Sequence, residues 1–256
     1  MAERVLVTGA TGFIGRHIPA LLQARGFEVH AAARNSSVLA AGITGHGVDL
    51  LRQDEVRRLI ADIRPAIIIH AAWYVAHGRF WTAPENTDWL EASTAFAAYA
   101  AEAGTRRFVG LGTCAEYANE AGDDAYPWPE SRRIAPATPY GEAKAALARR
   151  LAEMAEGRAR FSFAWARLFH LFGPGENPAR LVPSIMIALR EGRGDRDGRR
   201  SRAGAGAVGE VGLARGGERV GPVDAHAELG RATVEIECAR LEHRPAIARV
   251  EVGEIH

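Results

Sequence analysis

Short apolar runs alternate with amphipathic stretches along the first two thirds of the chain. One run, Ile67-Ile68-Ile69, is typical of a strand that is buried on both faces of a parallel sheet. The runs predict strands at Arg4–Val7, Phe27–Ala33, Gly47–Asp49, Ala66–Ala71, Arg107–Gly112 and Phe161–Leu168. The stretches between them predict helices at Gly12–Arg25, Gln53–Ile63, Thr87–Ala103 and Thr138–Glu156. This alternation indicates an α/β fold with a doubly wound parallel sheet and helices on both faces.

The pattern changes after Phe172. All 19 aromatic residues lie at or before this position, and 20 of the 28 residues from Arg190 to Gly217 are Gly, Arg or Ala. Such a segment has little apolar surface to offset the entropy lost on ordering. We therefore predict a Rossmann domain over residues 1–172 and a small, atypical or truncated substrate lobe over 173–256, partly disordered, with short elements at Thr233–Leu241 and Ile247–Val252.

Two interpretations of the segment after residue 190 remain open. It is either a flexible loop region that faces the substrate, or the product of a shifted reading frame, since a GC-rich gene read out of frame yields mostly Arg, Gly and Ala.

A glycine-rich turn follows the first predicted strand. Gly9, Gly12 and Gly15 have the spacing G-x-x-G-x-x-G between a strand and a helix. Such a turn lets the backbone approach a pyrophosphate, and the helix start offers it unpaired N–H groups. Because this pattern ends a strand, opens a helix and lies at the start of the chain, we favour a dinucleotide site over a ligand-free βα turn.

Lys144 is the only lysine among the 32 basic residues, and it lies four positions after Tyr140. At this spacing the two side chains share one face of a helix. An ammonium near a phenol favours the phenolate, so the pair predicts a tyrosine whose pKa is lowered toward neutrality and which exchanges a proton at physiological pH. The alternative is an ordinary surface pair on a helix.

Composition excludes several classes of protein. A net charge of +1 gives no attraction to nucleic acid or to an anionic membrane, and no apolar run approaches the length of a membrane span. The two cysteines, Cys114 and Cys238, lie far apart and have no metal-like spacing, so we expect a reducing compartment and no metal site. With no room for a signal peptide before the first strand, the expected location is the cytoplasm.

The motifs together resemble those of extended short-chain dehydrogenases/reductases of the NAD-dependent epimerase/dehydratase family. The resemblance covers residues 4 to about 190 and rests on motifs in the family's order: Thr8–Gly15, Asp49, His70-Ala71-Ala72, Thr113, Tyr140 with Lys144, and Arg167–Gly175. It implies an enzyme that acts on a nucleotide sugar. Catalysis would fall to Tyr140 as the general acid/base, to Thr113 as the partner of the reacting oxygen, and to Lys144, which would also hold the nicotinamide ribose. A strand-end threonine that only caps a helix is the alternative for Thr113.

The same resemblance implies a nicotinamide cofactor and the residues that bind it. Besides Tyr140 and Lys144, these are Gly9, Thr11, Gly12, Phe13, Ile14, Gly15, Arg34, Asp49, Leu50, Ala71 and Ala72. Asp49 would contact the adenine amino group, although an aspartate there also suits a helix cap. We expect His70 to matter for its position rather than for imidazole chemistry.

The end of the second strand predicts which cofactor is preferred. The sequence Ala33-Arg34-Asn35-Ser36-Ser37 has no acidic residue to grip a ribose 2′-hydroxyl, whereas an arginine accommodates the 2′-phosphate. We therefore predict NADP(H) over NAD(H), unless Arg34 is an ordinary surface residue.

On the substrate side the candidates are Trp73, Glu116 and His170. Trp73 either stacks on a sugar or base or covers the core, and Glu116 either contacts substrate or has a structural role. Family dehydratases carry an Asp-Glu pair after the threonine, and here Cys114-Ala115 replaces it, which disfavours dehydration. Cys114 has no cationic neighbour in sequence, so no nucleophilic role is expected.

These features favour reduction of a 4-keto nucleotide sugar over epimerisation, with a cofactor-binding but inactive chain as a further alternative. The family's Arg-Asp-Phe-x-x-Val-x-Asp-like stretch after Pro183-Ser184 is missing, which places substrate binding in doubt. The resemblance also implies a homodimer through the helices at Thr87–Ala103 and Thr138–Glu156.

Overall fold

The computed structural model of the chain describes residues 2–36, 39, 42–119, 128–191, 233–238 and 246–251. Its strands are β1 (Arg4–Thr8), β2 (Glu28–Ala33), β3 (Thr44–Gly47), β4 (Ile67–His70), β5 (Arg107–Thr113), β6 (Ser162–Leu168), β7 (Thr233–Cys238) and β8 (Ala246–Glu251). Its helices are α1 (Ile18–Ala24), α2 (Gln53–Ile63), α3 (Glu85–Glu102), α4 (Pro139–Glu156) and α5 (Leu181–Arg190), with 3₁₀ turns η1 (Gly15–His17) and η3 (Cys114–Glu116).

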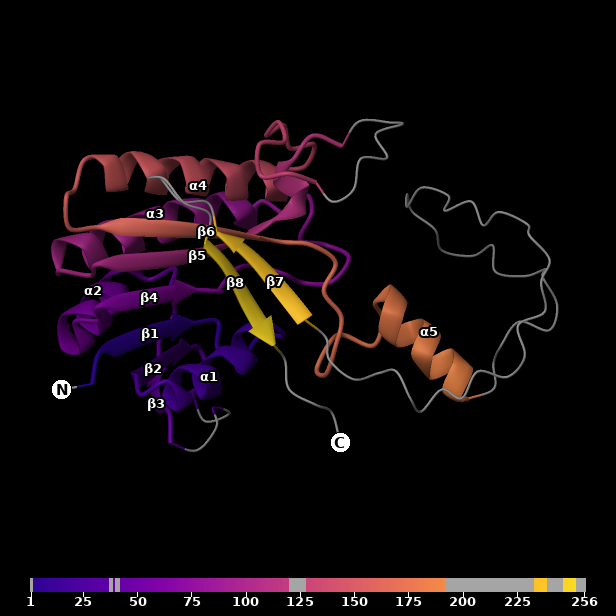
Figure 1. Ribbon diagram of the computed structural model, residues 1–256, viewed down its shortest axis with the longest axis horizontal. Coiled ribbons are helices and arrows are strands. Elements are labelled where there is room, and N and C mark those ends of the chain that lie inside the picture. Colours follow the sequence, from indigo (N-terminus) through magenta and orange to yellow (C-terminus); the bar gives the residue numbers. More distant parts are fainter. Residues whose placement is uncertain are drawn as a thin grey trace. The chain divides into compact units, whose positions relative to one another are not determined.

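The strands form one sheet in the order β3-β2-β1-β4-β5-β6-β7-β8 (Figure 1). Strands β1 to β6 are all parallel, and β7 lies antiparallel beside β6. The order 3-2-1-4-5-6 is that of the doubly wound dinucleotide-binding fold, so the predicted fold class is confirmed. Thr8 is paired with His70, and His70 with Gly110, so β1 and β4 end level with each other, and β5 continues to Thr113 at the same edge of the sheet.

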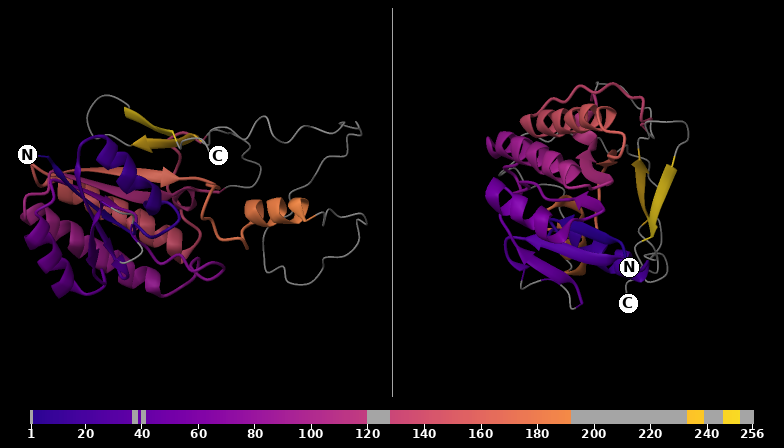
Figure 2. Two further views of the ribbon diagram at one scale, coloured as in Figure 1. Left: turned by 90° about the horizontal axis from the view of Figure 1, so that it is seen from below. Right: turned by 90° about the vertical axis from the view of Figure 1, so that its left-hand side faces the viewer.

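Helices cover both faces of the parallel sheet. On one face, α2, α3 and α4 pack on a core that includes Leu6, Ile68 and Phe108. On the other face, Ile18 and Leu22 of α1 pack on a smaller core that contains Val5, Val7, Val29 and Ala31. Figure 2 shows the layer of α2 to α4 on one side of the strands. Alternate residues of β1 point to opposite faces, which is why both cores draw on the same short strand.

The boundaries differ from the predicted ones at two places near the expected cofactor site. Strand β3 lies at Thr44–Gly47, a few residues before the predicted Gly47–Asp49. The predicted helix at Gly12–Arg25 begins only at η1 and α1, because residues 9–14 form the turn itself. The two short elements predicted near the C-terminus are strands β7 and β8.

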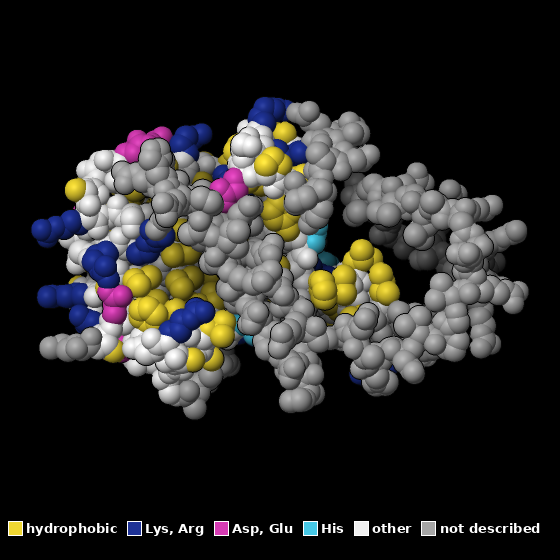
Figure 3. Space-filling model, viewed as in Figure 1, with side chains coloured by type: hydrophobic (Ala, Val, Ile, Leu, Met, Phe, Trp, Pro, Cys, Tyr) yellow, Lys and Arg dark blue, Asp and Glu magenta, His cyan; other side chains and the backbone are white. Residues whose placement is uncertain are grey.

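The chain divides into two compact units, residues 1–175 with 234–250, and residues 176–233 with 251–256. The predicted division at residue 172 places β7 and β8 in the second domain, whereas here they group largely with the first unit. In the second unit, several apolar side chains of helix α5 are exposed, including Leu181, Ile185 and Met186 (Figure 3). The Gly-, Arg- and Ala-rich segment lies almost wholly outside the described residues. Among the helices of the described part, none is long and apolar enough to cross a membrane.

Two glycines in β5 make room for a large side chain on β6. Gly110 and Trp165 are directly paired, and a Cβ on Gly110 or Gly112 would overlap the indole ring of Trp165. A Cβ on Gly112 would also meet the carboxylate of Glu116. These glycines therefore fix where Trp165 and Glu116 lie beneath the edge of the sheet.

We expect Gly112→Ala to lower the free energy of unfolding by about 1–3 kcal/mol, because the added methyl group has no space and the ring must shift. Urea denaturation followed by circular dichroism measures this change. Gly157→Ala is the matched control, since a Cβ there meets only ordinary contacts of 3.8 and 3.9 Å. If the Gly112→Ala protein is as stable as the Gly157→Ala protein, then Gly112 is not packed tightly against Trp165 and Glu116.

Candidate active site

The glycine-rich turn is built by close backbone approaches. Gly9 has φ +68°, and a Cβ there would lie 2.7 Å from the amide nitrogen of Ala72. A Cβ on Gly15 would overlap the carbonyl of Gly9, and the Gly12 amide donates to that same carbonyl at 2.9 Å. The turn exposes Thr11 and Gly12 and leaves Phe13 and Ile14 half-buried. The backbone at Thr11 and Gly12 is thus open to a ligand, as a pyrophosphate site requires.

An arginine that the sequence analysis did not single out lies on this turn. Arg16 donates from Nε to the Gly12 carbonyl at 3.1 Å and from Nη2 to the Thr11 carbonyl at 3.4 Å. A Cβ on Gly175 would overlap its guanidinium, so Gly175 packs directly on Arg16. Its position four residues after Gly12 was the available signal, since an i+4 side chain reaches back to the preceding turn.

The other predicted cofactor residues fall into two groups. Arg34 is exposed at the end of β2, and Ala71 and Ala72 follow β4 beside Gly9. Leu50, by contrast, is 6% exposed and belongs to the core, and Asp49 Oδ1 accepts from the backbone amide of Leu51 at 3.1 Å. Asp49 thus shapes its own loop, and it does not cap α2, whose N-cap is Arg52.

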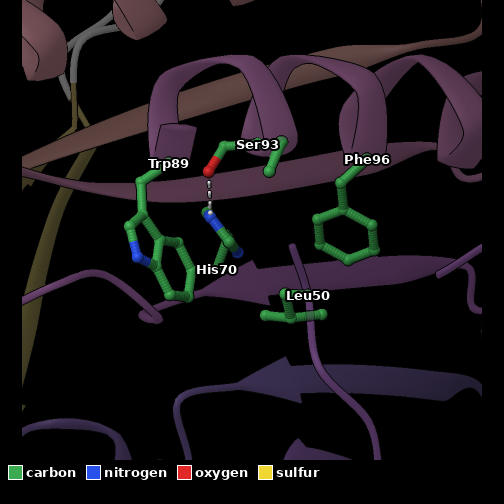
Figure 4. A pocket seen from close by; sticks show the side chains of 6 residues that line it. Leu50, His70, Trp89, Ser93 and Phe96 are labelled. Carbon is green, nitrogen blue, oxygen red and sulfur yellow. Dashed lines mark hydrogen bonds between the residues drawn. The ribbon is translucent and has the colours of Figure 1, made fainter. Parts of the chain in front are cut away.

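His70 of β4 is buried and hydrogen-bonds to residues of two other elements, and Figure 4 shows its bond to Ser93. Its Nδ1 lies 2.8 Å from Thr8 Oγ1 of β1, and its Nε2 lies 2.9 Å from Ser93 Oγ of α3. Burial, with a smaller contribution from Lys144, lowers the pKa of His70 to about 3, so the ring is neutral. A neutral, hydrogen-bonded histidine fits the expectation that its position matters rather than proton transfer.

The threonine and tyrosine of the predicted catalytic set come together at the end of β5. The side chain of Thr113 lies close enough to Tyr140 to lower the pKa of the phenol, and it accepts the Ala115 amide at 3.2 Å as the N-cap of η3. Capping and contact with Tyr140 are therefore compatible roles. Gly141 allows this approach, because a Cβ there would overlap the carbonyl of Ala115.

The environment of Tyr140 differs from the one that the sequence predicted. Burial raises the pKa of Tyr140 to about 12, opposed by the hydrogen bond from Thr113. The rings of Phe80 and Trp81 stand edge-on to the phenol, with centroids 4.9 and 5.7 Å away. The predicted lowering toward neutrality is wrong here, because burial disfavours the phenolate and the nearby carboxylate of Glu116 raises the pKa of Tyr140 further. Tyr140 is therefore a protonated phenol at neutral pH.

Lys144 shares the face of α4 with Tyr140, as their spacing predicts, but its ammonium points elsewhere. Its Nζ donates to the Leu111 carbonyl at 2.9 Å and lies 3.9 Å from the centroid of the Trp73 ring. The side chain is 4% exposed. Burial lowers the pKa of Lys144 to about 7, and the charge of Glu116 opposes this shift.

Glu116 and Trp73 are buried, unlike the substrate contacts that the sequence suggested for them. Glu116 is 0% exposed and accepts from the Thr113 amide at 2.8 Å, from Trp165 Nε1 at 3.0 Å and from Arg167 Nε at 2.7 Å. Trp73 is 8% exposed and donates from Nε1 to Asn86 Oδ1 at 2.9 Å. The structural alternatives therefore hold for both residues. No local sequence motif pairs Glu116 with Trp165 or Arg167, or Trp73 with Asn86, because each partner lies 13 to 51 residues away.

Two further side chains complete the edge of the sheet. His170 is exposed two residues beyond the end of β6 and remains a candidate for substrate contact. Burial raises the pKa of the Cys114 thiol, so the thiolate is disfavoured and no nucleophilic role is indicated. Among the described residues, no group of three or more His, Cys, Asp and Glu side chains is placed to hold a metal ion.

Comparison with known proteins agrees with the fold and the motifs. A sequence profile of the NAD-dependent epimerase/dehydratase family matches residues 5–205. The chain therefore belongs to this family, and the resemblance seen in its motifs is confirmed.

Solved structures show the same fold. The UDP-glucose 4-epimerase of Thermotoga maritima, solved with UDP-glucose, is 22% identical with a TM-score of 0.63 over 72% of this chain and 61% of that one. The UDP-glucose 4-epimerase of Thermus thermophilus, in complex with NAD, is 26% identical with a TM-score of 0.61 over 72% and 61%. MoeE5, in complex with UDP-glucose and NAD, is 28% identical with a TM-score of 0.62 over 74% and 62%. This chain thus spans less than two thirds of the length of each of these proteins.

We expect Glu116→Ala to lower the free energy of unfolding by about 3–5 kcal/mol, because it leaves the buried donors of Arg167, Trp165 and Thr113 without their acceptor. Thermal and urea denaturation measure the loss. Glu102→Ala is the control, since Glu102 is exposed near the end of α3. Equal stability of the two variants would show that the carboxylate of Glu116 is not the buried acceptor.

Proposed function

We propose that this chain is an NADP-dependent oxidoreductase that reduces the keto group of a 4-keto nucleotide sugar. The observation that carries the proposal is that Thr113 and the protonated Tyr140 lie together at the carboxyl edge of the sheet, with Lys144 one turn further along α4. Ligands of open α/β sheets bind at this edge. Membership of the NAD-dependent epimerase/dehydratase family and neighbours solved with NAD or UDP-glucose support a nicotinamide cofactor and a nucleotide-sugar substrate.

The chain has a cradle that suits a dinucleotide. The close approaches at Gly9 and Gly15 leave no room for side chains, and Thr11 and Gly12 are exposed above them. The residues that would hold the cofactor are those of this turn, with Arg34 at the end of β2 and Ala71 and Ala72 beside it. When bound, the cofactor would supply a hydride to the substrate carbon.

The protein residues would supply the proton and the orientation. Tyr140 is protonated at neutral pH, which is the form that can donate a proton to a keto oxygen as its carbon accepts hydride. The Thr113 hydroxyl is a neighbour of the same phenol and would orient the oxygen. Lys144 would complete the site from the same face of α4. Reduction of C=O to CH–OH then takes one hydride and one proton, with Tyr140 reprotonated from solvent.

Two other functions remain to be separated from this one. An epimerase would use the same residues but would regenerate its cofactor in each turnover, so it would show no net consumption of NADPH. A chain that binds cofactor without turnover is favoured by its atypical C-terminal third, which lacks the family's Arg-Asp-Phe-x-x-Val-x-Asp-like stretch after Pro183-Ser184.

The proposed assembly is a homodimer through α3 and α4. These helices pack against one another on the same face of the sheet, and both contain alanine-rich stretches that permit close helix approach. Family analogy supports this arrangement.

We expect net oxidation of NADPH with a 4-keto nucleotide sugar, and a loss of roughly 10²- to 10⁴-fold in kcat for Tyr140→Phe, because the proton donor is gone. Nicotinamide absorbance follows turnover, and calorimetry measures NADPH binding, which the variant should retain. Tyr99→Phe is the control, since Tyr99 accepts a hydrogen bond from Arg57 away from the site. Product formation without NADPH loss would indicate the epimerase, and binding without turnover in the wild type would indicate the inactive chain.

We expect NADP(H) to have a Michaelis constant at least about tenfold lower than NAD(H), because a guanidinium binds the 2′-phosphate and no acid at the end of β2 grips a 2′-hydroxyl. Arg34→Ala should raise the constant for NADP(H) about tenfold and leave that for NAD(H) unchanged. Arg25→Ala, an exposed arginine after α1, serves as the control. Tighter binding of NAD(H) by the wild type would refute the preference.

A further inference from the structure

The ammonium of Lys144 rests on the face of a buried indole. Its Nζ lies 3.9 Å from the centroid of the Trp73 ring and 6.0 Å from that of Trp165. An ammonium has three donors, and within the described part of the chain that of Lys144 donates to one acceptor, the carbonyl of Leu111, at 2.9 Å. Because the side chain is 4% exposed, water cannot fully replace the missing acceptors. The indole face is thus a principal source of attraction for this charge.

The orientation of the indole is fixed from α3. Trp73 Nε1 donates to Asn86 Oδ1 at 2.9 Å, and Asn86 is 2% exposed. The amide of Asn86 donates in turn to the carbonyls of Phe80 at 2.7 Å and Ala83 at 2.9 Å. This places the Trp73 ring under Lys144 in one orientation rather than in a family of rotamers.

The same loop also holds Tyr140. The amide of Tyr140 donates to the carbonyl of Trp81 at 3.1 Å, and the rings of Phe80 and Trp81 flank the phenol. Asn86 therefore links Trp73, which contacts the Lys144 ammonium, to the Phe80 segment, which contacts the phenol of Tyr140. The two residues of the Tyr140/Lys144 pair are placed by one hydrogen-bonded frame.

We propose that Trp73 is a positioning residue that holds the side chain of Lys144 against the end of β5 and stabilises its charged form. The importance of this contact for catalysis rests on the proposed function, in which Lys144 acts beside Tyr140. A cation over an indole gains the most of any aromatic pairing, and the gain is larger when the cation is desolvated.

The other groups that face Lys144 do not remove the need for this support. Glu116, at the end of η3, favours the ammonium, but it is shared with Arg167 at 2.7 Å. His70 of β4 is neutral, and Tyr140 on the same helix is protonated. Burial still brings the pKa of Lys144 down to about 7, so the balance between ammonium and amine is close at physiological pH. A modest attraction from the indole then changes the charged fraction measurably.

The sequence permits a direct test, because Lys144 is the only lysine of the chain. Full-length protein labelled with ¹³C-lysine gives a single ε-CH₂ signal in an NMR spectrum. Protons above the face of an aromatic ring are shifted upfield by its ring current. We expect the ε-CH₂ protons of the wild type to lie upfield of those of free lysine, and Trp73→Leu to abolish most of this displacement.

The same signal reports the charge when its ¹³C shift is followed against pH. We expect Trp73→Leu to lower the pKa of Lys144 by about 0.5–1 unit, because leucine fills the space without a ring face. Trp73→Phe keeps a ring but loses the bond to Asn86, so we expect a smaller ring-current displacement and an intermediate pKa. Trp128→Leu is the matched control, since Trp128 packs on Arg132 and Tyr117 and should leave the signal unchanged.

A wild-type ε-CH₂ signal at the position of free lysine would overturn the proposal, and so would a pKa that is unchanged or higher in Trp73→Leu. If Trp73→Leu does not fold by circular dichroism, the wild-type spectrum and Trp73→Phe still decide it. These measurements need no substrate, so their failure is distinct from failure of the reductase assay. Where turnover is observed, the pH dependence of kcat should show an apparent pKa due to Lys144. This apparent pKa should change in each variant in the same direction as the pKa measured by NMR.

Discussion

A single buried carboxylate, that of Glu116, joins the sheet to the residues that would do chemistry. It accepts the amide of Thr113, the indole N–H of Trp165 and the guanidinium of Arg167, all at 2.7–3.0 Å. A buried charge is tolerated only when such partners satisfy it, so its position is tightly fixed. Because Thr113 and Glu116 form a reciprocal cap around η3, the orientation of the Thr113 hydroxyl follows from the position of that carboxylate.

Close packing at three glycines then sets the geometry of the site around this carboxylate. Gly110 and Gly112 leave space for the Trp165 ring, and Gly141 lets the start of α4 approach the carbonyl of Ala115. Tyr140 then meets Thr113, and Lys144 reaches the carbonyl of Leu111 one turn along the same helix. A methyl group on Gly110 or Gly112 would displace the Trp165 ring, and one on Gly141 would push the start of α4 away from Ala115. The site is therefore a property of how β5, β6 and α4 pack, rather than of one loop.

Desolvation controls the proton equilibria of the pair. It raises the pKa of Tyr140 to about 12 and lowers that of Lys144 to about 7, so both groups favour their neutral forms relative to free side chains. In the sequence, an ammonium four residues from a phenol indicated the opposite effect on the tyrosine. The difference arises because the amine is directed to Leu111 and Trp73, while the phenol is enclosed by Phe80 and Trp81. A protonated phenol suits the donation of a proton during reduction.

The sequence by itself determined the order of strands and helices through β6, the glycine-rich turn and the spacing of Tyr140 and Lys144, because each depends on residues close together in the chain. It also indicated the family through motifs of the same local kind. Only the tertiary structure decided the roles of Glu116 and Trp73, which are buried supports rather than substrate contacts. Their partners lie 49 and 13 residues away, at Trp165 and Asn86. Which side chains lose water depends on such distant contacts, and no local pattern of residues records them.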